Sequence, residues 1–199
     1  MIRSALLLLA GYAAGSLPFG FWIARGFKAV DVRTLGSKNT GATNVWRTCG
    51  AKLGMLTLLL DLAKGAFPAA LALHFAGPNV AVLVGAAAVI GHSFPVLLGF
   101  GGGKGVATGA GVLAAVAPLC FVVALGVFLL ALAIGRFVSL ASMLGAVTCF
   151  GVAVATGKSA AVIAFCGLVG GFVILRHRAN IGRLLGGTEP RIRLGKSRA

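Results

Sequence analysis

Long runs of apolar residues, interrupted by short polar segments, dominate this chain of 199 residues. The apolar runs cover approximately residues 3–24, 53–76, 79–98, 105–135, 138–157 and 159–175. A helix needs about 20 apolar residues to cross the hydrocarbon core of a bilayer, so these runs are typical of membrane spans. The pattern predicts an all-α, polytopic integral membrane helical bundle, with residues 1–199 forming a single domain.

Two of the runs need interpretation before the spans can be counted. The run 3–24 continues through Ser16-Leu17-Pro18-Phe19-Gly20, so it is long enough to be a retained helix and not a signal peptide. The run 105–135 would measure about 45 Å as one helix, which is too long for an ordinary span. A break at Ala117-Pro118 divides it into two short helices, because proline interrupts a helix. The prediction is therefore seven transmembrane helices.

Charge fixes the predicted orientation. Only 11% of the residues are charged, 59% are hydrophobic, and the formal net charge is +15. The cations gather in the loop 25–52, at Lys104 and in the tail, which holds Arg176, Arg178, Arg183, Arg191, Arg193, Lys196 and Arg198. The positive-inside rule places these segments in the cytoplasm, with the N-terminus outside and the C-terminus cytoplasmic. The same rule explains the high positive charge, so nucleic acid is not expected as a partner.

The first polar segment runs from Gly36 to Asn44, with Arg47 a few residues on. Small residues leave backbone N–H groups accessible, and the segment adds hydroxyls, amides and nearby cations. These are the groups that bind a phosphate. The segment therefore predicts an anion site next to a membrane span.

The second polar segment, Gly99 to Thr108, contains Gly102-Gly103-Lys104-Gly105. It resembles a nucleotide phosphate loop, but Gly105 stands where that motif has Ser or Thr, so ATP binding is not expected. Glycine backbone and Lys104 at a helix N-terminus favour a phosphate site. The simpler interpretation is a flexible turn with one orienting lysine.

The third polar segment is Arg176-His177-Arg178-Ala179-Asn180-Ile181. Two arginines after an apolar run could simply stop translocation. His177 and Asn180, however, are three residues apart and share one face of a helix, which favours a functional site. In the predicted topology all three polar segments lie on the cytoplasmic side.

The remaining ionisable and sulfur-containing residues favour structural roles. The three acids are Asp31, Asp61 and Glu189, and Asp61 lies in an apolar run three residues before Lys64. Such a pair either neutralises its own charges or forms a functional intramembrane site, and we favour the structural role. His92 is interpreted as a buried hydrogen-bonding residue and His74 as incidental. The four cysteines have no metal or disulfide spacing, and no metal site is predicted.

Taken together, the motifs resemble those of the bacterial acyl-phosphate:glycerol-3-phosphate acyltransferases of the PlsY type. The resemblance spans most of the chain, in this order: Gly15-Ser16-Leu17-Pro18-Phe19-Gly20, Gly36 to Asn44, Leu60-Asp61-Leu62-Ala63-Lys64-Gly65, Gly91-His92-Ser93-Phe94-Pro95, Gly102 to Thr108, and Arg176 to Ile181. Each motif is short, and their order and spacing make the match specific.

The resemblance implies a multi-pass enzyme of the bacterial inner membrane with a cytoplasmic active site. It would transfer an acyl group from acyl phosphate to the 1-hydroxyl of glycerol 3-phosphate, producing lysophosphatidate and phosphate without ATP, CoA, a metal or another cofactor. Its implied partners are these two substrates and membrane lipids. The expected catalytic residues are Ser37, Arg47, Lys104, His177 and Asn180. The expected substrate-binding residues are Gly36, Asn39, Thr40, Gly41, Thr43, Asn44, Gly102, Gly103, Gly105 and Thr108.

The sequence departs from the family pattern at two places. Lys38-Asn39-Thr40 replaces a frequent Gly-Asn-Pro, and Ala179 replaces a common glutamate, which weakens any mechanism with that glutamate as base. Either His177 or the departing phosphate then accepts the proton, and we favour the phosphate.

Three other function classes are weighed against the acyltransferase. A transporter of a phosphorylated metabolite also suits glycine-rich broken helices, but the polar groups gather on one side of the predicted membrane. A CoA-dependent acyltransferase of the His-x4-Asp type lacks its aspartate after each of the three histidines. A structural subunit leaves the phosphate-type loops unexplained.

Overall fold

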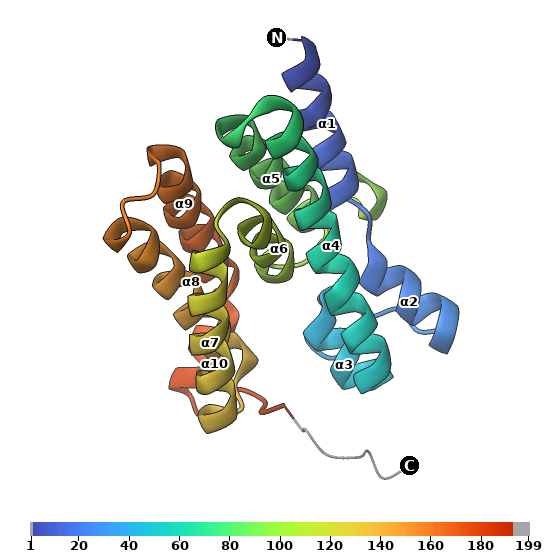
Figure 1. The fold of residues 1–199 in the computed structure, drawn as a ribbon. Helices are drawn as coiled ribbons and strands as arrows, with labels where there is room; N and C mark the ends of the chain where they lie inside the picture. Colours follow the sequence, from blue (N-terminus) through green and yellow to red (C-terminus); the bar gives the residue numbers. More distant parts are fainter. Residues whose placement is uncertain (1, 193–199) are drawn as a thin grey trace. The chain divides into compact units, whose positions relative to one another are not determined.

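The computed structural model describes residues 2–192, and these residues form only α-helices, one 3-10 turn and loops (Figure 1). The all-α prediction is therefore confirmed for the described residues. The tail cations Arg193, Lys196 and Arg198, which entered the orientation argument, lie outside them. The chain divides into two compact units, residues 1–116 and 117–199, and each is described by itself.

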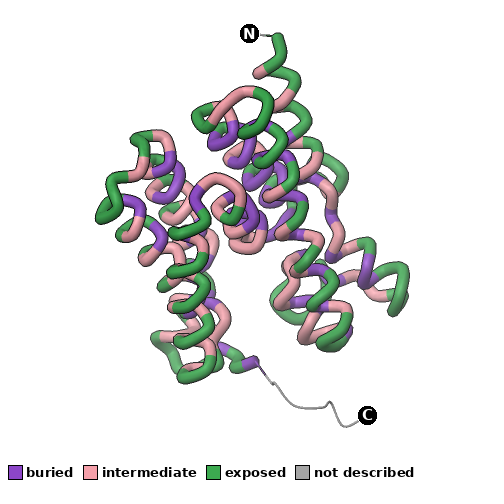
Figure 2. The backbone as a smooth tube through the Cα atoms, in the orientation of Figure 1, coloured by how far each residue is buried: buried purple, intermediate pink, exposed green. Residues whose placement is uncertain are grey.

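The first unit contains α1 (Ile2–Gly15), α2 (Phe19–Lys28), α3 (Ala42–Cys49), α4 (Ala51–Ala76), α5 (Pro78–Ser93), the 3-10 turn η1 (Val96–Leu98) and α6 (Val106–Val116). The long helix α4 packs against α1, α3, α5 and α6, and α1 also packs along α5. Buried residues lie on the facing sides of these helices, whereas outward apolar side chains such as Leu59, Phe67 and Leu83 are exposed (Figure 2). An apolar exterior of this kind fits a lipid environment.

Glycine allows α4 and α6 to approach closely. A methyl group at Gly65 of α4 would overlap the backbone carbonyl of Thr108, and one at Gly111 of α6 would overlap the carbonyl of Leu62. Small residues at such crossings bring helix backbones together in membranes, where packing rather than hydrophobicity drives association. The close contact fixes the first turns of α6, which follow the glycine-rich loop.

The second unit contains α7 (Pro118–Gly135), α8 (Val138–Ala155), α9 (Ala160–Arg176) and α10 (Arg178–Leu185). Helix α8 packs against α7 and α9, and α10 turns away from α9 by 58° at His177. Cys120, Cys149 and Cys166 of this unit are all buried free thiols.

Helix length and apolar composition support five membrane spans, or six if α9 and α10 form one bent span. The predicted break at Ala117-Pro118 is confirmed, because α6 ends at Val116 and Pro118 begins α7. The one predicted span that is not supported is the first half of the run 105–135, which corresponds to α6 and has 11 residues. At 1.5 Å per residue it is about 16 Å long, roughly half the hydrocarbon thickness, so it does not count as a span by length.

The first apolar run is not one continuous helix as expected. It breaks at residues 16–18, between α1 and α2, although the two segments together still pass as a single candidate span. Pro18 accounts for the break, since it supplies no N–H and restricts the residue before it. The break frees backbone carbonyls, and one of them, that of Leu17, has a side-chain partner described below.

Candidate functional site

The first predicted segment forms a loop that the side chain of Asn44 holds together. Asn44 lies in the first turn of α3 and is 2% exposed. Its amide nitrogen is 2.8 Å from the carbonyl oxygens of Val32 and Asn39, and 3.1 Å from that of Leu35. Its amide oxygen accepts the N–H of Ser37 at 2.9 Å. Asn44 therefore organises the loop, and its polar atoms face the protein rather than a ligand.

The residues around Asn44 leave Ser37 at the surface of this loop. Ser37 is exposed and follows Gly36, whose φ of 57° is a left-handed conformation that glycine adopts readily. Thr43 and Arg47 are four residues apart on α3, so they lie on the same face of that helix. Arg33 is already paired, since its guanidinium contacts Asp31 at 2.7 Å and holds the pKa of that carboxyl down at about 2.

The second predicted segment is a loop between η1 and α6 that is pinned by its backbone. The N–H of Gly102 donates to the carbonyl of Ser93 at 3.2 Å, and the N–H of Gly103 donates to the carbonyl of His92 at 3.0 Å. Gly105, with a φ of 82°, immediately precedes α6, so the half-buried Lys104 lies at the N-terminal end of that helix. A helix N-terminus and a cation together favour an anion.

The two loops lie next to each other within the first unit. The side-chain amide of Asn39 donates to the carbonyl of Gly102 at 3.4 Å, and its oxygen accepts the N–H of Gly41 at 2.8 Å. The first and second predicted segments therefore meet in the folded first unit. Thr108, in contrast, is fully buried in α6 with its backbone against Gly65 of α4.

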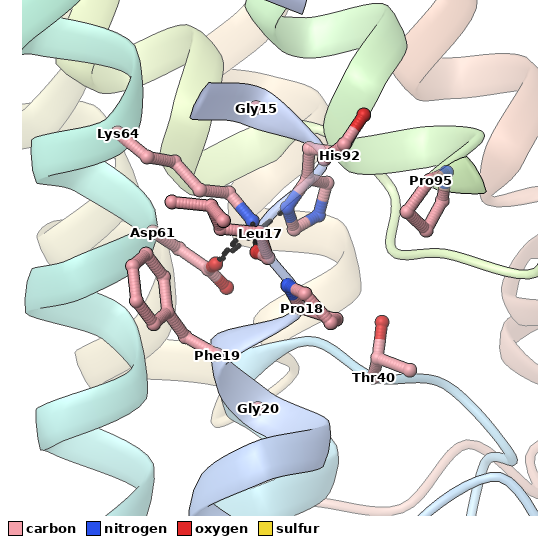
Figure 3. A pocket seen from close by; sticks show the side chains of 11 residues that line it. Gly15, Leu17, Pro18, Phe19, Gly20, Thr40, Asp61, Lys64, His92 and Pro95 are labelled. Carbon is pink, nitrogen blue, oxygen red and sulfur yellow. Dashed lines mark hydrogen bonds and ion pairs between the residues drawn. The ribbon is translucent and has the colours of Figure 1, made fainter. Parts of the chain in front are cut away.

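A small pocket behind the loops is lined by Thr40, the α1–α2 break and three ionisable side chains (Figure 3). Asp61 and Lys64 of α4 form an ion pair of 2.8 Å, which confirms the expected neutralisation. His92 of α5 is buried, also as expected. Nothing in the sequence placed Asp61 near the polar loops, whereas the structure puts it in the same pocket as Thr40.

The third predicted segment belongs to the second unit. His177 lies at the bend between α9 and α10, is 3% exposed, and its ring nitrogen Nδ1 is 2.8 Å from the carbonyl of Val173. A carbonyl oxygen can only accept, so Nδ1 carries a proton, and in the neutral form of the ring the lone pair is on Nε2. The bend thus fixes the orientation of the imidazole through Nδ1.

Glu189 is a residue of this region that the motifs did not identify. Its carboxylate accepts hydrogen bonds from Asn180 and Ser139 at 2.7 Å each and from Arg183 at 2.8 Å. Burial raises the pKa of Glu189, but these donors outweigh burial and lower the pKa below its ordinary value. The sequence feature that could have identified Glu189 is its rarity, since it is one of three acids in a strongly basic chain.

Comparison with known proteins shows which family the chain belongs to. The family model described as glycerol-3-phosphate acyltransferase matches residues 5–187. The chain is 44% identical to the glycerol-3-phosphate acyltransferase of Listeria monocytogenes serotype 4a (strain HCC23), over 96% of this chain and 98% of that protein. It is 45% identical to the one from Synechococcus sp. (strain JA-2-3B'a(2-13)), over 96% of each. The chain belongs to the glycerol-3-phosphate acyltransferase family.

Two crystal structures of a relative support this assignment. The glycerol 3-phosphate form of PlsY (YgiH), an integral membrane glycerol 3-phosphate acyltransferase, matches with a TM-score of 0.92 and 40% identity over 96% of each chain. Its lysophosphatidic acid form matches with a TM-score of 0.88 and 39% identity over the same shares. The resemblance to the PlsY type is confirmed, and with it an acyltransferase that is a multi-pass integral membrane protein. The transporter and structural-subunit alternatives are set aside.

Proposed function

We propose that this acyltransferase moves a fatty acyl group from an acyl phosphate to the 1-hydroxyl of glycerol 3-phosphate, with lysophosphatidate and phosphate as products. The observation that carries the proposal is the contact between the two loops, where Asn39 donates to the carbonyl of Gly102. Two phosphorylated substrates react only if both are held within bonding distance in one site. Adjacent loops of phosphate-binding character meet that requirement.

The first loop would bind the acyl phosphate. Ser37 lies at its surface, and Arg47 on α3 supplies a permanent positive charge. Gly36, Gly41 and Thr43 would complete the cradle through backbone and hydroxyl groups. Asn44 was expected to contact the substrate directly, and we propose a different role. Asn44 holds Ser37 in place, because its side-chain oxygen accepts the N–H of Ser37.

The second loop would bind glycerol 3-phosphate. Lys104 lies where the N-terminus of α6 also favours negative charge, and the backbone of Gly102 and Gly103 is held by α5. A lysine here offsets the repulsion between two phosphates that must come close together. Oriented cationic and N–H groups also stabilise the oxyanion that forms during acyl transfer.

His177 and Asn180 of the second unit are the remaining catalytic residues of the proposal, which treats residues 1–199 as one acyltransferase domain. The positive-inside rule places the site in the cytoplasm, because Lys104, Arg47 and the cationic tail share one side in the predicted topology. The inner membrane then supplies acyl phosphate from the lipid phase, while glycerol 3-phosphate arrives from water.

The proposed reaction needs no further activation, since an acyl phosphate is already a reactive mixed anhydride. The 1-hydroxyl oxygen forms a bond to the acyl carbonyl carbon, and the bond from that carbon to the phosphate oxygen breaks. The proton of the hydroxyl leaves with the departing phosphate. His177 orients the hydroxyl through Nε2, because Nδ1 donates to Val173.

Replacing His177 with Gln tests this role. Glutamine keeps a hydrogen-bonding group near Nε2 but cannot act as a base, so we expect kcat to fall by less than about 100-fold. The measurement is steady-state kinetics with both substrates varied. A loss of turnover by thousands with KM unchanged would instead identify His177 as the base.

The proposed function is tested with protein purified in detergent, palmitoyl phosphate and glycerol 3-phosphate. We expect phosphate and lysophosphatidate in equal amounts, and neither product when glycerol 3-phosphate is replaced by glycerol. Palmitoyl-CoA serves as the control donor and is expected to be inactive. Uptake of labelled glycerol 3-phosphate into vesicles without acyl phosphate, and no lysophosphatidate, would contradict the proposal.

A further inference from the structure

A buried cluster of three ionisable side chains lies behind the two loops (Figure 3). The carboxylate of Asp61 is 2.8 Å from Lys64 Nζ and 3.6 Å from His92 Nδ1, and all three side chains are 5% exposed or less. Burying charges costs several kcal/mol per ion unless each group has partners, and the cost is higher in a membrane. Simple neutralisation accounts for Asp61 and Lys64 but leaves the third member, His92, without a role.

Lys64 connects the cluster to the first loop. Its ammonium group donates to the carbonyl of Leu17 at 2.8 Å, at the point where α1 stops and the backbone lacks a helical partner. Two residues into α2, Gly20 lies so close to the carbonyl of Thr40 that no methyl group would fit. The ion pair therefore fixes the start of α2, on which the loop residue Thr40 rests.

His92 connects the cluster to the second loop. Its carbonyl accepts the N–H of Gly103, and the ideal position of a methyl group on Gly103 coincides with His92 Nε2. The imidazole is thus the surface on which Gly103 packs, one residue before Lys104. The other ring nitrogen, Nδ1, makes an electrostatic contact of 3.6 Å with a carboxylate oxygen of Asp61, which is longer than a hydrogen bond, and Lys64 fixes the position of that carboxylate.

We propose that His92, oriented by Asp61, is a positioning residue that sets the place of the glycine-rich loop and so of Lys104. The inference rests on the proposed binding of glycerol 3-phosphate by that loop. The ring sets how closely Gly103 approaches α5, and the carboxylate of Asp61 sets the rotation of the ring. Loss of the ring or of its orientation moves Lys104 relative to the phosphate without removing any group that touches substrate.

Two neighbouring glycines provide a matched test. The three atoms nearest to a methyl group on Gly103 are all ring atoms of His92, whereas one on Gly102 overlaps the carbonyls of His92 and Ser93 and the ring of Pro95. We expect Gly103→Ala and Gly102→Ala each to raise KM for glycerol 3-phosphate by about tenfold or more, with KM for acyl phosphate changed far less. Adding His92→Ala removes the obstacle for Ala at 103 and not for Ala at 102.

We therefore expect His92→Ala to reduce the KM defect of Gly103→Ala and not that of Gly102→Ala. The variant with His92→Ala and Gly103→Ala should have a KM for glycerol 3-phosphate several-fold lower than Gly103→Ala alone, while His92→Ala gives no improvement to Gly102→Ala. Equal behaviour of the two pairs, or equal changes in KM for both substrates, would overturn the proposal. If the unmodified protein forms no lysophosphatidate, the proposed function fails and not the positioning role.

A second pair of variants keeps the test decisive if the alanine variants do not fold. His92→Asn retains an N–H donor near the position of Nδ1, whereas His92→Leu has a similar size and no donor. We expect His92→Asn to keep KM for glycerol 3-phosphate within about threefold of the unmodified protein and His92→Leu to raise it about tenfold, as for the loss of a buried polar contact. Identical KM values for the two variants would show that Asp61 does not act through the ring.

Discussion

The two units use different means to hold their polar segments in place. In the first unit the loops are fixed mainly through the backbone: N–H groups of Gly102 and Gly103 bind carbonyls of α5, and glycines allow the close approach. In the second unit a single carboxylate, Glu189, gathers the side chains of Asn180, Ser139 and Arg183. The first arrangement depends on shape and the second on charge.

This difference predicts different sensitivities to mutation. Behind the backbone-held loops lies an ion pair whose two side chains are each 3% exposed, whereas Arg183 in the carboxylate cluster is 37% exposed. Water stabilises an exposed charge whose partner has been lost, but it does not reach a buried one. Removing one charge of the buried pair should therefore be far more damaging than removing Glu189, which leaves the partly exposed Arg183 in contact with water.

Replacing Lys64 with Met is expected to have the largest effect. It leaves the carboxylate of Asp61 buried without its ammonium partner and removes the side-chain donor of the Leu17 carbonyl, so we expect a loss of about 3–5 kcal/mol in unfolding free energy. Thermal unfolding in detergent measures it. Asp61→Leu combined with Lys64→Met removes both charges and should recover much of the loss. A double variant as unstable as the single one would show that the pair is not the cause.

Replacing Glu189 with Gln should have an intermediate effect on unfolding free energy, about 1–3 kcal/mol, because three donors lose a charged acceptor. The folded pKa of Glu189 is lowered from 4.5, so its stabilisation is complete above that pH and is lost as the pH falls through the lower folded value. The unmodified protein should therefore lose stability below about pH 4.5, and the variant should lose less.

The control for this variant is Arg183→Met, which removes one half-exposed donor and keeps the carboxylate. We expect a loss of less than about 1 kcal/mol, because the lost partner is itself partly exposed, and Asn180 and Ser139 still donate to the carboxylate. Unfolding curves for both variants over a series of pH values give the comparison. Equal losses for the two, or a pH dependence that survives in Glu189→Gln, would contradict the central role of the carboxylate.

The sequence predicted the elements that depend on local chemistry. Hydrophobic run lengths gave the long helices, and Ala117-Pro118 gave the break between α6 and α7, because a missing N–H acts at one position of the chain. The Gly102–Gly105 segment was predicted as a loop leading into a helix for the same local reason. The break between α1 and α2 followed equally from Pro18 but was missed, since hydrophobicity continues across it.

The contacts that the sequence did not predict join residues far apart in the chain. Asp61 was paired correctly with Lys64, three residues away, but its neighbour His92 and the nearby Thr40 come from other elements. Asn44 was expected to face substrate, and only the folded loop shows that carbonyls of residues 32, 35 and 39 surround its amide. Such partners depend on helix packing, which apolar periodicity does not specify.

Replacing Asn39 with Ala should have the smallest effect of the three stability tests. The bond from its amide to Gly102 is long, at 3.4 Å, so most of the loss comes from the 2.8 Å bond to the Gly41 N–H. One neutral hydrogen bond contributes about 1 kcal/mol to the free energy of unfolding. If the same free energy is lost from substrate binding, KM rises by about fivefold or less. Asn39→Asp is the control, because it keeps the acceptor for Gly41 and loses only the donor to Gly102. If Asn39→Ala destabilised the protein as much as Lys64→Met, the direct contact between the loops, and not the buried pair behind them, would hold the first unit's site together.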